Sequence, residues 1–211
     1  MKRPRIFLAD DHCLLLEAFC TLLEPKYEIV GTATDGREML AKVTKLDPDV
    51  VVLDISMPNL NGFDAAGKLR KLLPEAKIVF LTMNDEPDMV TEAFKIGAKG
   101  YLLKNSAASE LFQAIDAVLR GDSYVSPQLT QGMIGSFMKD PAGEKEHGQL
   151  TFRQREVLQL LAEGKTMKEV ASVLFITPRT VAFHKYQMME DIGVKRNSEL
   201  IQYAFKHGLV A

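Results

Sequence analysis

The sequence predicts two domains. The first, over residues 1–122, is an α/β domain with a doubly wound parallel five-stranded sheet, and the second, over residues 149–211, is a small all-α domain of four helices. Two observations support this: five short apolar runs alternate with five helical patterns in the first part, and only helix signals occur in the last part. Residues 123–148 carry a polar stretch with proline and glycine that is typical of a linker.

The five apolar runs have the composition of strands that are buried on both faces of a parallel sheet. They are short, rich in β-branched residues and mostly free of polar alternation, and they span residues 6–9, 27–33, 50–53, 78–81 and 100–103. Each is followed by a segment with apolar residues at intervals of three and four. These predicted helices span residues 14–23, 37–46, 63–72, 89–96 and 109–119.

Local signals agree with these helices. Asp35 and Glu38 have the spacing of a capping box, which marks a helix N-terminus. Gly97 and Gly121 stand where a helix C-terminus favours a left-handed residue. Beyond them, residues 126–138 could form one more helix before the polar linker of residues 139–148.

The last part has four helix starts. Thr151 and Thr166 begin segments with capping-box spacing, and Thr177 precedes a proline at the first helical position. Ser198 begins the fourth segment. The two middle helices, near residues 167–174 and 178–191, are joined by a three-residue turn, which is the helix-turn-helix arrangement.

Composition excludes several classes of protein. With 46% hydrophobic and 26% charged residues in 211, both domains can bury a core. No apolar run approaches the length of about 20 residues that a membrane helix needs, and we expect neither a membrane protein nor a signal peptide. Cys13 and Cys20 are too few for a disulfide framework or a zinc site, so we expect reduced thiols in a cytoplasmic protein.

Charge differs between the two domains. Residues 1–122 hold 15 Lys and Arg against 19 Asp and Glu, whereas residues 149–211 hold nine against six. The difference is a weak indication that the domains meet different partners.

Polar residues follow four of the predicted strands. Asp10 and Asp11 follow the first strand, Asp54 the third, Thr82 the fourth and Lys104 the fifth. In open α/β sheets the ligand crevice lies beyond the carboxyl ends of the strands, where the strand order reverses. If the first and third strands are neighbours there, the three carboxylates converge.

Converging carboxylates repel one another unless a cation is present, and Mg²⁺ prefers such oxygen ligands. With Mg²⁺ and the Lys104 ammonium nearby, one carboxylate could attack a phosphorus atom, and Thr82 could donate a hydrogen bond to a phosphoryl oxygen. Each residue alone has an ordinary explanation, since an aspartate pair often caps a helix and polar residues often end strands. Their joint occurrence at four strand ends favours a functional site.

These motifs resemble the receiver domain of two-component response regulators over residues 3–122. The matching residues are Asp10-Asp11, Asp54 to Pro58 followed by Gly62, Thr82, and Tyr101 with Lys104. The resemblance implies a flavodoxin-like fold with strand order 2-1-3-4-5 and Asp54 as the phosphoacceptor, which a sensor histidine kinase phosphorylates. It also implies that Thr82 and Tyr101 reorient on phosphorylation and bias an equilibrium between inactive and active forms.

The same resemblance implies a metal site. Asp11, Asp54 and the backbone carbonyl of Ser56 would bind Mg²⁺, and Asp10 would act mainly through water. One departure is Asn105, since many receivers have a proline in a cis peptide after this lysine. A non-proline cis bond costs about 2.5–4 kcal/mol, so the Lys104–Asn105 bond is either trans or strained.

Nearly the whole of residues 149–207 resembles the LuxR-type helix-turn-helix. The matching segments are Leu150 to Leu158, Leu161 to Gly164, Lys168 to Ala171 and Ile176 to His184. With a receiver in front, the architecture resembles the NarL/FixJ class of transcriptional regulators, and such regulators act as homodimers on paired half-sites.

The second helix of a helix-turn-helix enters the major groove of DNA. By resemblance, the residues that face the groove are Arg179, Ala182, Phe183, Lys185 and Tyr186. The candidate phosphate contacts are Lys168, His184 and the amides near Thr166 and Thr177, and Thr180 completes the DNA-binding set.

This surface departs from the family. Ala182 stands where lysine is usual and Met167 where asparagine is frequent. Fewer cations weaken the non-specific part of DNA affinity, although apolar contact with a thymine methyl could replace part of it.

The function predicted from these motifs is that of a response regulator transcription factor. Phosphorylation of Asp54 would control homodimerisation and sequence-specific binding of double-stranded promoter DNA. An alternative is a regulator whose helical domain binds protein, because Phe183, Tyr186 and Met189 form a stripe that could contact protein or belong to the core.

A phosphohydrolase with an aspartyl nucleophile is a third possibility. Haloacid-dehalogenase-like hydrolases place a second acid two residues after the nucleophile, where this chain has Ser56. We therefore expect no enzyme beyond a receiver that catalyses its own phosphoryl transfer and dephosphorylation.

Overall fold

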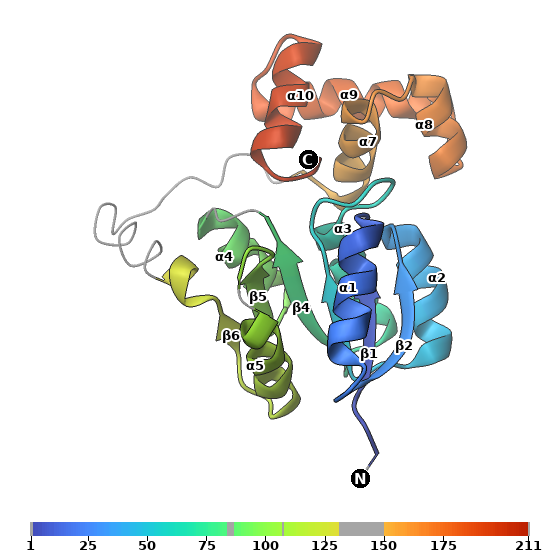
Figure 1. The fold of residues 1–211 in the computed structure, drawn as a ribbon. Helices are drawn as coiled ribbons and strands as arrows, with labels where there is room; N and C mark the ends of the chain where they lie inside the picture. The colour runs from blue at the N-terminus through green and yellow to red at the C-terminus, as the bar shows by residue number, and fades with distance from the viewer. Residues whose placement is uncertain (1, 84–86, 107, 131–149, 211) are drawn as a thin grey trace.

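The computed structural model describes residues 2–83, 87–106, 108–130 and 150–210 (Figure 1). An α/β domain carries a helical domain at one end (Figure 1). Among the described residues, no helix combines the length and apolar character needed to cross a membrane.

The α/β domain has one parallel sheet with the order β2-β1-β3-β4-β5-β6. Its strands are β1 (Arg5–Ala9), β2 (Glu28–Ala33), β3 (Val50–Leu53), β4 (Lys77–Thr82), β5 (Gly100–Leu103) and β6 (Tyr124–Val125). The five predicted strands and their order are confirmed. The two-residue β6, which pairs with β5, is the sixth strand; it is too short for a periodic pattern and lies in the segment predicted as linker.

Five helices cover the two faces of the sheet. They are α1 (Cys13–Leu23), α2 (Gly36–Leu46), α3 (Gly62–Leu72), α4 (Pro87–Ile96) and α5 (Ala108–Leu119). Successive strand residues point to opposite faces, so Ile6 and Leu8 join the core under α1 and α5. Phe7 and Ala9 join the core under α2, α3 and α4. The strands lack polar alternation because both faces are buried.

The predicted helix ends are present. The Asp35 carboxylate accepts hydrogen bonds from the Arg37 and Glu38 amides at the start of α2. Gly97 and Gly121 have φ of +100° and +93° after α4 and α5. After β6, Pro127 to Thr130 form a helical turn, while the rest of the predicted helix 126–138 and the predicted linker 139–148 lie outside the described residues.

The helical domain contains α7 (Phe152–Ala162), α8 (Met167–Leu174), α9 (Pro178–Ile192) and α10 (Asn197–Lys206). Thr151 and Thr166 form the predicted capping boxes, and Pro178 is the first residue of α9. Helix α10 begins one residue before the predicted Ser198, with Arg196 as its N-cap. The helices enclose their own core, which includes Val157, Val170, Val181, Met188 and Leu200.

Candidate functional site

Three carboxylates meet at the carboxyl ends of β1 and β3. The two strands are neighbours, and the Asp54 amide donates to the Ala9 carbonyl over 2.9 Å. Asp10 and Asp54 are only 4% and 3% exposed, while Asp11 is partly exposed. The structure therefore brings together the three acidic residues that the sequence singles out.

Lys104 lies among these carboxylates. Its Nζ is 2.7 Å from Asp10 Oδ2 and 2.8 Å from Asp54 Oδ2, and its side chain is buried. Among the described residues no peptide bond is cis, so the Lys104–Asn105 bond is trans. The ammonium reaches both carboxylates without the cis bond that the family often has at this point.

Burial and charge shift the pKa values here in ways that support this pairing. Burial raises the pKa of Asp54; Lys104 opposes this rise, and Asp10 and Asp11 add to it. Burial acts to lower the pKa of Lys104, but Asp54 and Asp10 outweigh it, so the net pKa is raised. Lys104 therefore stays charged at neutral pH, as electrostatic stabilisation of a transferring anionic group requires.

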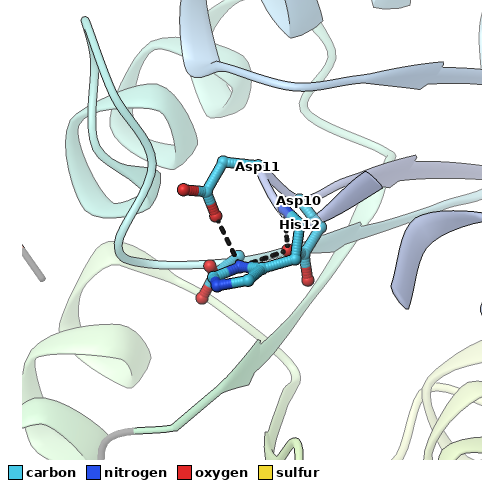
Figure 2. A group of neighbouring side chains, drawn as sticks. Asp10, Asp11 and His12 are labelled. Atoms are coloured by element: carbon cyan, nitrogen blue, oxygen red, sulfur yellow. Dashed lines mark hydrogen bonds and ion pairs between the residues drawn. The ribbon is translucent and has the colours of Figure 1, made fainter. Parts of the chain in front are cut away.

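His12 is a neighbour of the acidic site that the sequence motifs do not indicate. Its Nδ1 lies 2.8 Å from Asp11 Oδ1 and 3.2 Å from Asp10 Oδ1 (Figure 2). Its backbone amide donates to Asp10 Oδ1 over 2.9 Å. One potential ligand atom from each of Asp10, Asp11, His12 and Asp54 lies within 4.8 Å of the others. The sequence signal that could have identified His12 was its position directly after the aspartate pair.

A tight loop follows Asp54. The Gly62 amide donates to the Ile55 carbonyl over 2.7 Å and closes the loop. A Cβ atom on Gly62 would lie 2.1 Å from the Asp54 carbonyl oxygen, so the Gly62 backbone lies directly against the backbone of the phosphoacceptor candidate. Ser56 lies within this loop and is half-buried.

Thr82 and Tyr101 lie on the strands next to Lys104. Thr82 ends β4, and its carbonyl accepts a hydrogen bond of 2.8 Å from the Lys104 amide. Tyr101 is buried on β5, with its ring centroid 6.4 Å from that of Phe80. Their reorientation on phosphorylation stays a prediction.

The predicted DNA-reading residues lie on α9. Phe183 and Tyr186 are 63% and 64% exposed, and Arg179 is exposed as well. Ala182 and Lys185 are half-buried, and Lys185 Nζ lies 5.6 Å from the centroid of the Tyr186 ring. These residues form a surface of two cations and two aromatic rings.

The candidate phosphate contacts differ in how available they are. Lys168 is exposed on α8. Thr177 caps α9, and its hydroxyl is 2.9 Å from that of Thr180. The Thr166 amide instead donates to the Glu169 carboxylate over 2.7 Å, so a phosphate would have to compete with an anion already bound there.

His184 and Met189, two further residues predicted for this surface, are half-buried. Burial, together with Arg153, lowers the pKa of His184, so a phosphate contact from this residue would come from a neutral ring at pH 7. Met189 packs against the helical core, whereas Phe183 and Tyr186 do not belong to it. The predicted stripe is therefore divided between core and surface.

A contact between the domains was not predicted at all. Gln159 of α7 is fully buried; its Nε2 donates to the Met57 carbonyl over 2.7 Å, and its Oε1 accepts from the Asn61 amide over 2.8 Å. Nothing in a single sequence says which surfaces of two domains meet. The available signal was an amide side chain within the apolar run from Val157 to Ala162.

Asp64 of α3 is part of the same contact and is fully buried. Its Oδ1 accepts from Arg155 Nε over 2.9 Å, and its Oδ2 accepts from Asn61 Nδ2 over 3.0 Å. Burial raises the pKa of Asp64 to about 6; Arg155, Asn61 and Lys68 oppose this rise, and Glu156 adds to it.

This shift predicts a pH-dependent stability. Because the native pKa is above the unfolded value of 3.8, the stabilising contribution of Asp64 is fully present below about pH 4 and is lost as the pH rises through about 6. Between pH 4 and 7 we expect the parent to lose about 1–3 kcal/mol more than Asp64→Asn. Urea unfolding followed by circular dichroism measures this, since the chain has no tryptophan. Parallel pH curves for the two proteins would contradict it.

Two family models match the chain. Residues 6–116 match the response regulator receiver domain, and residues 148–204 match the luxR family of bacterial regulatory proteins. The oxygen regulatory protein NreC of Staphylococcus carnosus is 35% identical over 214 residues, which cover 98% of this chain and 99% of that protein.

Solved structures agree. A LuxR-family two-component response regulator from Aurantimonas is 34% identical, with a TM-score of 0.62 over 65% of this chain and 99% of that chain. RcsB from Salmonella enterica serovar Typhimurium, bound to a promoter in the presence of a phosphomimetic, is 26% identical, with a TM-score of 0.66 over 96% of this chain and 98% of that chain. This chain therefore belongs to the response regulators that join a receiver to a LuxR-type helix-turn-helix, and it is a transcription regulator rather than a classical enzyme.

Proposed function

We propose that a sensor histidine kinase phosphorylates Asp54, and that this controls homodimerisation and promoter binding. The receiver would span residues 1–122, the linker residues 123–148, with β6 at the start of this segment completing the receiver sheet, and the DNA-binding domain residues 149–211. The observation that carries the proposal is the pair of buried carboxylates, Asp10 and Asp54, on either side of the Lys104 ammonium. Because its partner is promoter DNA, the protein would act in the cytoplasm.

The donor set fits a hard divalent ion. Asp11, Asp54 and the Ser56 carbonyl would hold Mg²⁺, and Asp10 would act mainly through water; three carboxylates within reach of one another favour such an ion over softer metals. When bound, the ion would supply positive charge next to the transferring phosphoryl group.

The chain itself would supply the nucleophile and its surroundings. A carboxylate oxygen of Asp54 would form the bond to phosphorus as the phosphorus–nitrogen bond of the kinase phosphohistidine breaks. Lys104 would then pair with the phosphoryl oxygens, and the Thr82 hydroxyl would donate to one of them. Tyr101 would reorient together with Thr82, and slow hydrolysis by the receiver itself would end the signal.

Helix α9 would read DNA. Arg179 and Lys185 would supply charge, and Phe183 and Tyr186 would contact thymine methyl groups, with Ala182 on the same groove-facing surface. Lys168, Thr177 and Thr180 would contact phosphates, and Thr166 and His184 would contribute less for the reasons given above. A homodimer would place two such helices on paired half-sites.

The phosphoacceptor is tested with a small phosphodonor and Mg²⁺, by intact-mass measurement. We expect the parent to gain one phosphoryl group and Asp54→Asn to gain none, because an amide is not a nucleophile for phosphorus. Asp122→Asn is the matched control, since it removes an exposed carboxylate outside the site. Equal uptake by Asp54→Asn and the parent would refute the proposal.

Selection of bound genomic DNA, with and without the phosphodonor, tests the output. We expect enrichment of sites with two-fold symmetry that strengthens on phosphorylation, and an affinity that falls steeply with salt. The exposed Phe183 and Tyr186 keep a second candidate function open, a protein-binding output. No preference over random DNA would favour that function.

A further inference from the structure

Helix α7 separates the receiver from the DNA-reading helix. Figure 1 shows α7 at the boundary between the two domains, against α3, with α9 farther from the sheet. The inner face of α9, with Val181 and Met188, is buried in the core to which α7 contributes Val157 and Leu158. The receiver therefore contacts the helical domain through α7, on the side away from the exposed face of α9.

A polar cluster holds the two domains together, and we call it the clasp. It consists of Arg155, Glu156 and Gln159 on α7 with Arg37, Asn61, Asp64 and Lys68 of the receiver. In addition to the Gln159 and Asp64 bonds described above, Lys68 Nζ lies 2.8 Å from Glu156 Oε1. Burial acts to raise the pKa of Glu156, but Lys68 and Arg153 outweigh it and hold the pKa below its usual range.

The chemistry of the clasp makes docking specific but reversible. Its amide and carboxylate groups are buried when the domains meet, and each would regain water on separation. The net value of one such hydrogen bond is therefore about 0.5–1.5 kcal/mol rather than its gross energy. Contacts of this polar kind are typical of domains that dock and separate.

The clasp also connects to the turn that precedes α9. Arg153 NH1 lies 3.0 Å from Glu156 Oε2, and Arg153 NH2 donates to the Leu174 carbonyl over 2.8 Å. The receiver thus contacts, through Glu156, a residue that holds the end of α8. Meanwhile Arg179, Phe183 and Tyr186 stay exposed on α9.

We propose that the clasp carries the helix-turn-helix in a DNA-competent position, so that the docked chain binds duplex DNA containing a single half-site. This inference rests on the proposed function. Phosphorylation then acts on the relative placement of two copies, because α9 is already uncovered in one. The clasp attaches the helical domain to the receiver and leaves the DNA-reading surface of α9 exposed.

The test uses the full chain with Arg37→Glu and Lys68→Glu together. Both side chains pair with the buried Glu156, so two new carboxylates facing it repel α7 without altering Asp54 or α9. Lys42→Glu with Lys45→Glu is the matched control, because it makes the same charge change on exposed positions of α2. Small-angle scattering reports docking independently of DNA, and we expect the clasp variant to be more extended than the parent and the control.

Fluorescence anisotropy then measures affinity for a labelled duplex with one half-site of the selected sequence. We expect the unphosphorylated parent, control and clasp variant to agree within about twofold. Binding by the clasp variant that is about tenfold tighter than that of parent and control would overturn the inference, since α9 would then be masked by docking. An equally compact clasp variant would also overturn it. If none of the three unphosphorylated proteins prefers the selected duplex over random DNA, the inference fails but the proposed function stands. That function fails only if the phosphorylated parent also shows no preference for a duplex with paired half-sites.

Discussion

Replacing Lys104 with methionine is expected to destabilise the protein by about 3–5 kcal/mol at neutral pH. The substitution keeps the length of the side chain but removes the ammonium that lies 2.7 and 2.8 Å from two buried carboxylates. Those carboxylates would then repel each other in a site with little water. Urea unfolding followed by circular dichroism at several pH values measures the loss.

The pH dependence separates this cause from lost packing. Without Lys104 the pKa of Asp54, already raised by burial, rises further, so protonation relieves the repulsion and the deficit shrinks as the pH falls. Mg²⁺ should restore part of the stability, because a divalent ion supplies the missing charge. Lys26→Met is the control: it removes an exposed ion pair with Asp116 and should cost less than about 1 kcal/mol. A deficit in Lys104→Met that is the same at all pH values would count against the electrostatic explanation.

Gly62→Ala is expected to cost about 3 kcal/mol and to abolish phosphoryl uptake. The new methyl group would lie 2.1 Å from the Asp54 carbonyl oxygen and 2.8 Å from the Ile55 Cα, which are backbone atoms that cannot rotate away. The loop must therefore shift, and Asp54 and Ser56 shift with it. Unfolding by urea and intact mass after phosphodonor treatment measure the two effects.

Gly164→Ala is the matched control for this substitution. Gly164 has φ of +85°, but no atom beyond its own residue and its two chain neighbours lies within 4 Å of its added Cβ. The control substitution should therefore lower the stability only by the cost of placing a Cβ atom at a left-handed φ, which is about 1–2 kcal/mol. It should take up phosphoryl groups normally. Equal stabilities for Gly62→Ala and the parent would show that the close approach over Asp54 is not required.

The acidic cluster was predictable because strand ends are visible in the sequence. Runs such as Val50–Leu53 end abruptly in a polar residue, and parallel strands bring their carboxyl ends to one edge. The helix starts at Thr151 and Thr166 were predictable for a similar reason, since capping uses residues three apart in the chain.

The features that escaped prediction depend on distant residues. Gln159 is buried only because the loop after Asp54 offers it a carbonyl and two donors, and no local pattern contains that loop. His12 joins the acidic site through the geometry of the turn after β1. The Thr166 amide was predicted as a phosphate donor, but its own capping box gives it a carboxylate partner.

The short strand β6 determines where the chain can be truncated to give an isolated receiver domain. Tyr124 and Val125 cover the outer edge of β5, and the buried Ser126 donates through its hydroxyl to Glu110 over 2.7 Å. A fragment that stops at residue 122 would leave the β5 edge open to strand exchange with neighbouring molecules. A fragment that continues to residue 130 keeps that edge covered, so soluble receiver preparations from this chain should extend beyond the last long helix of the sheet domain.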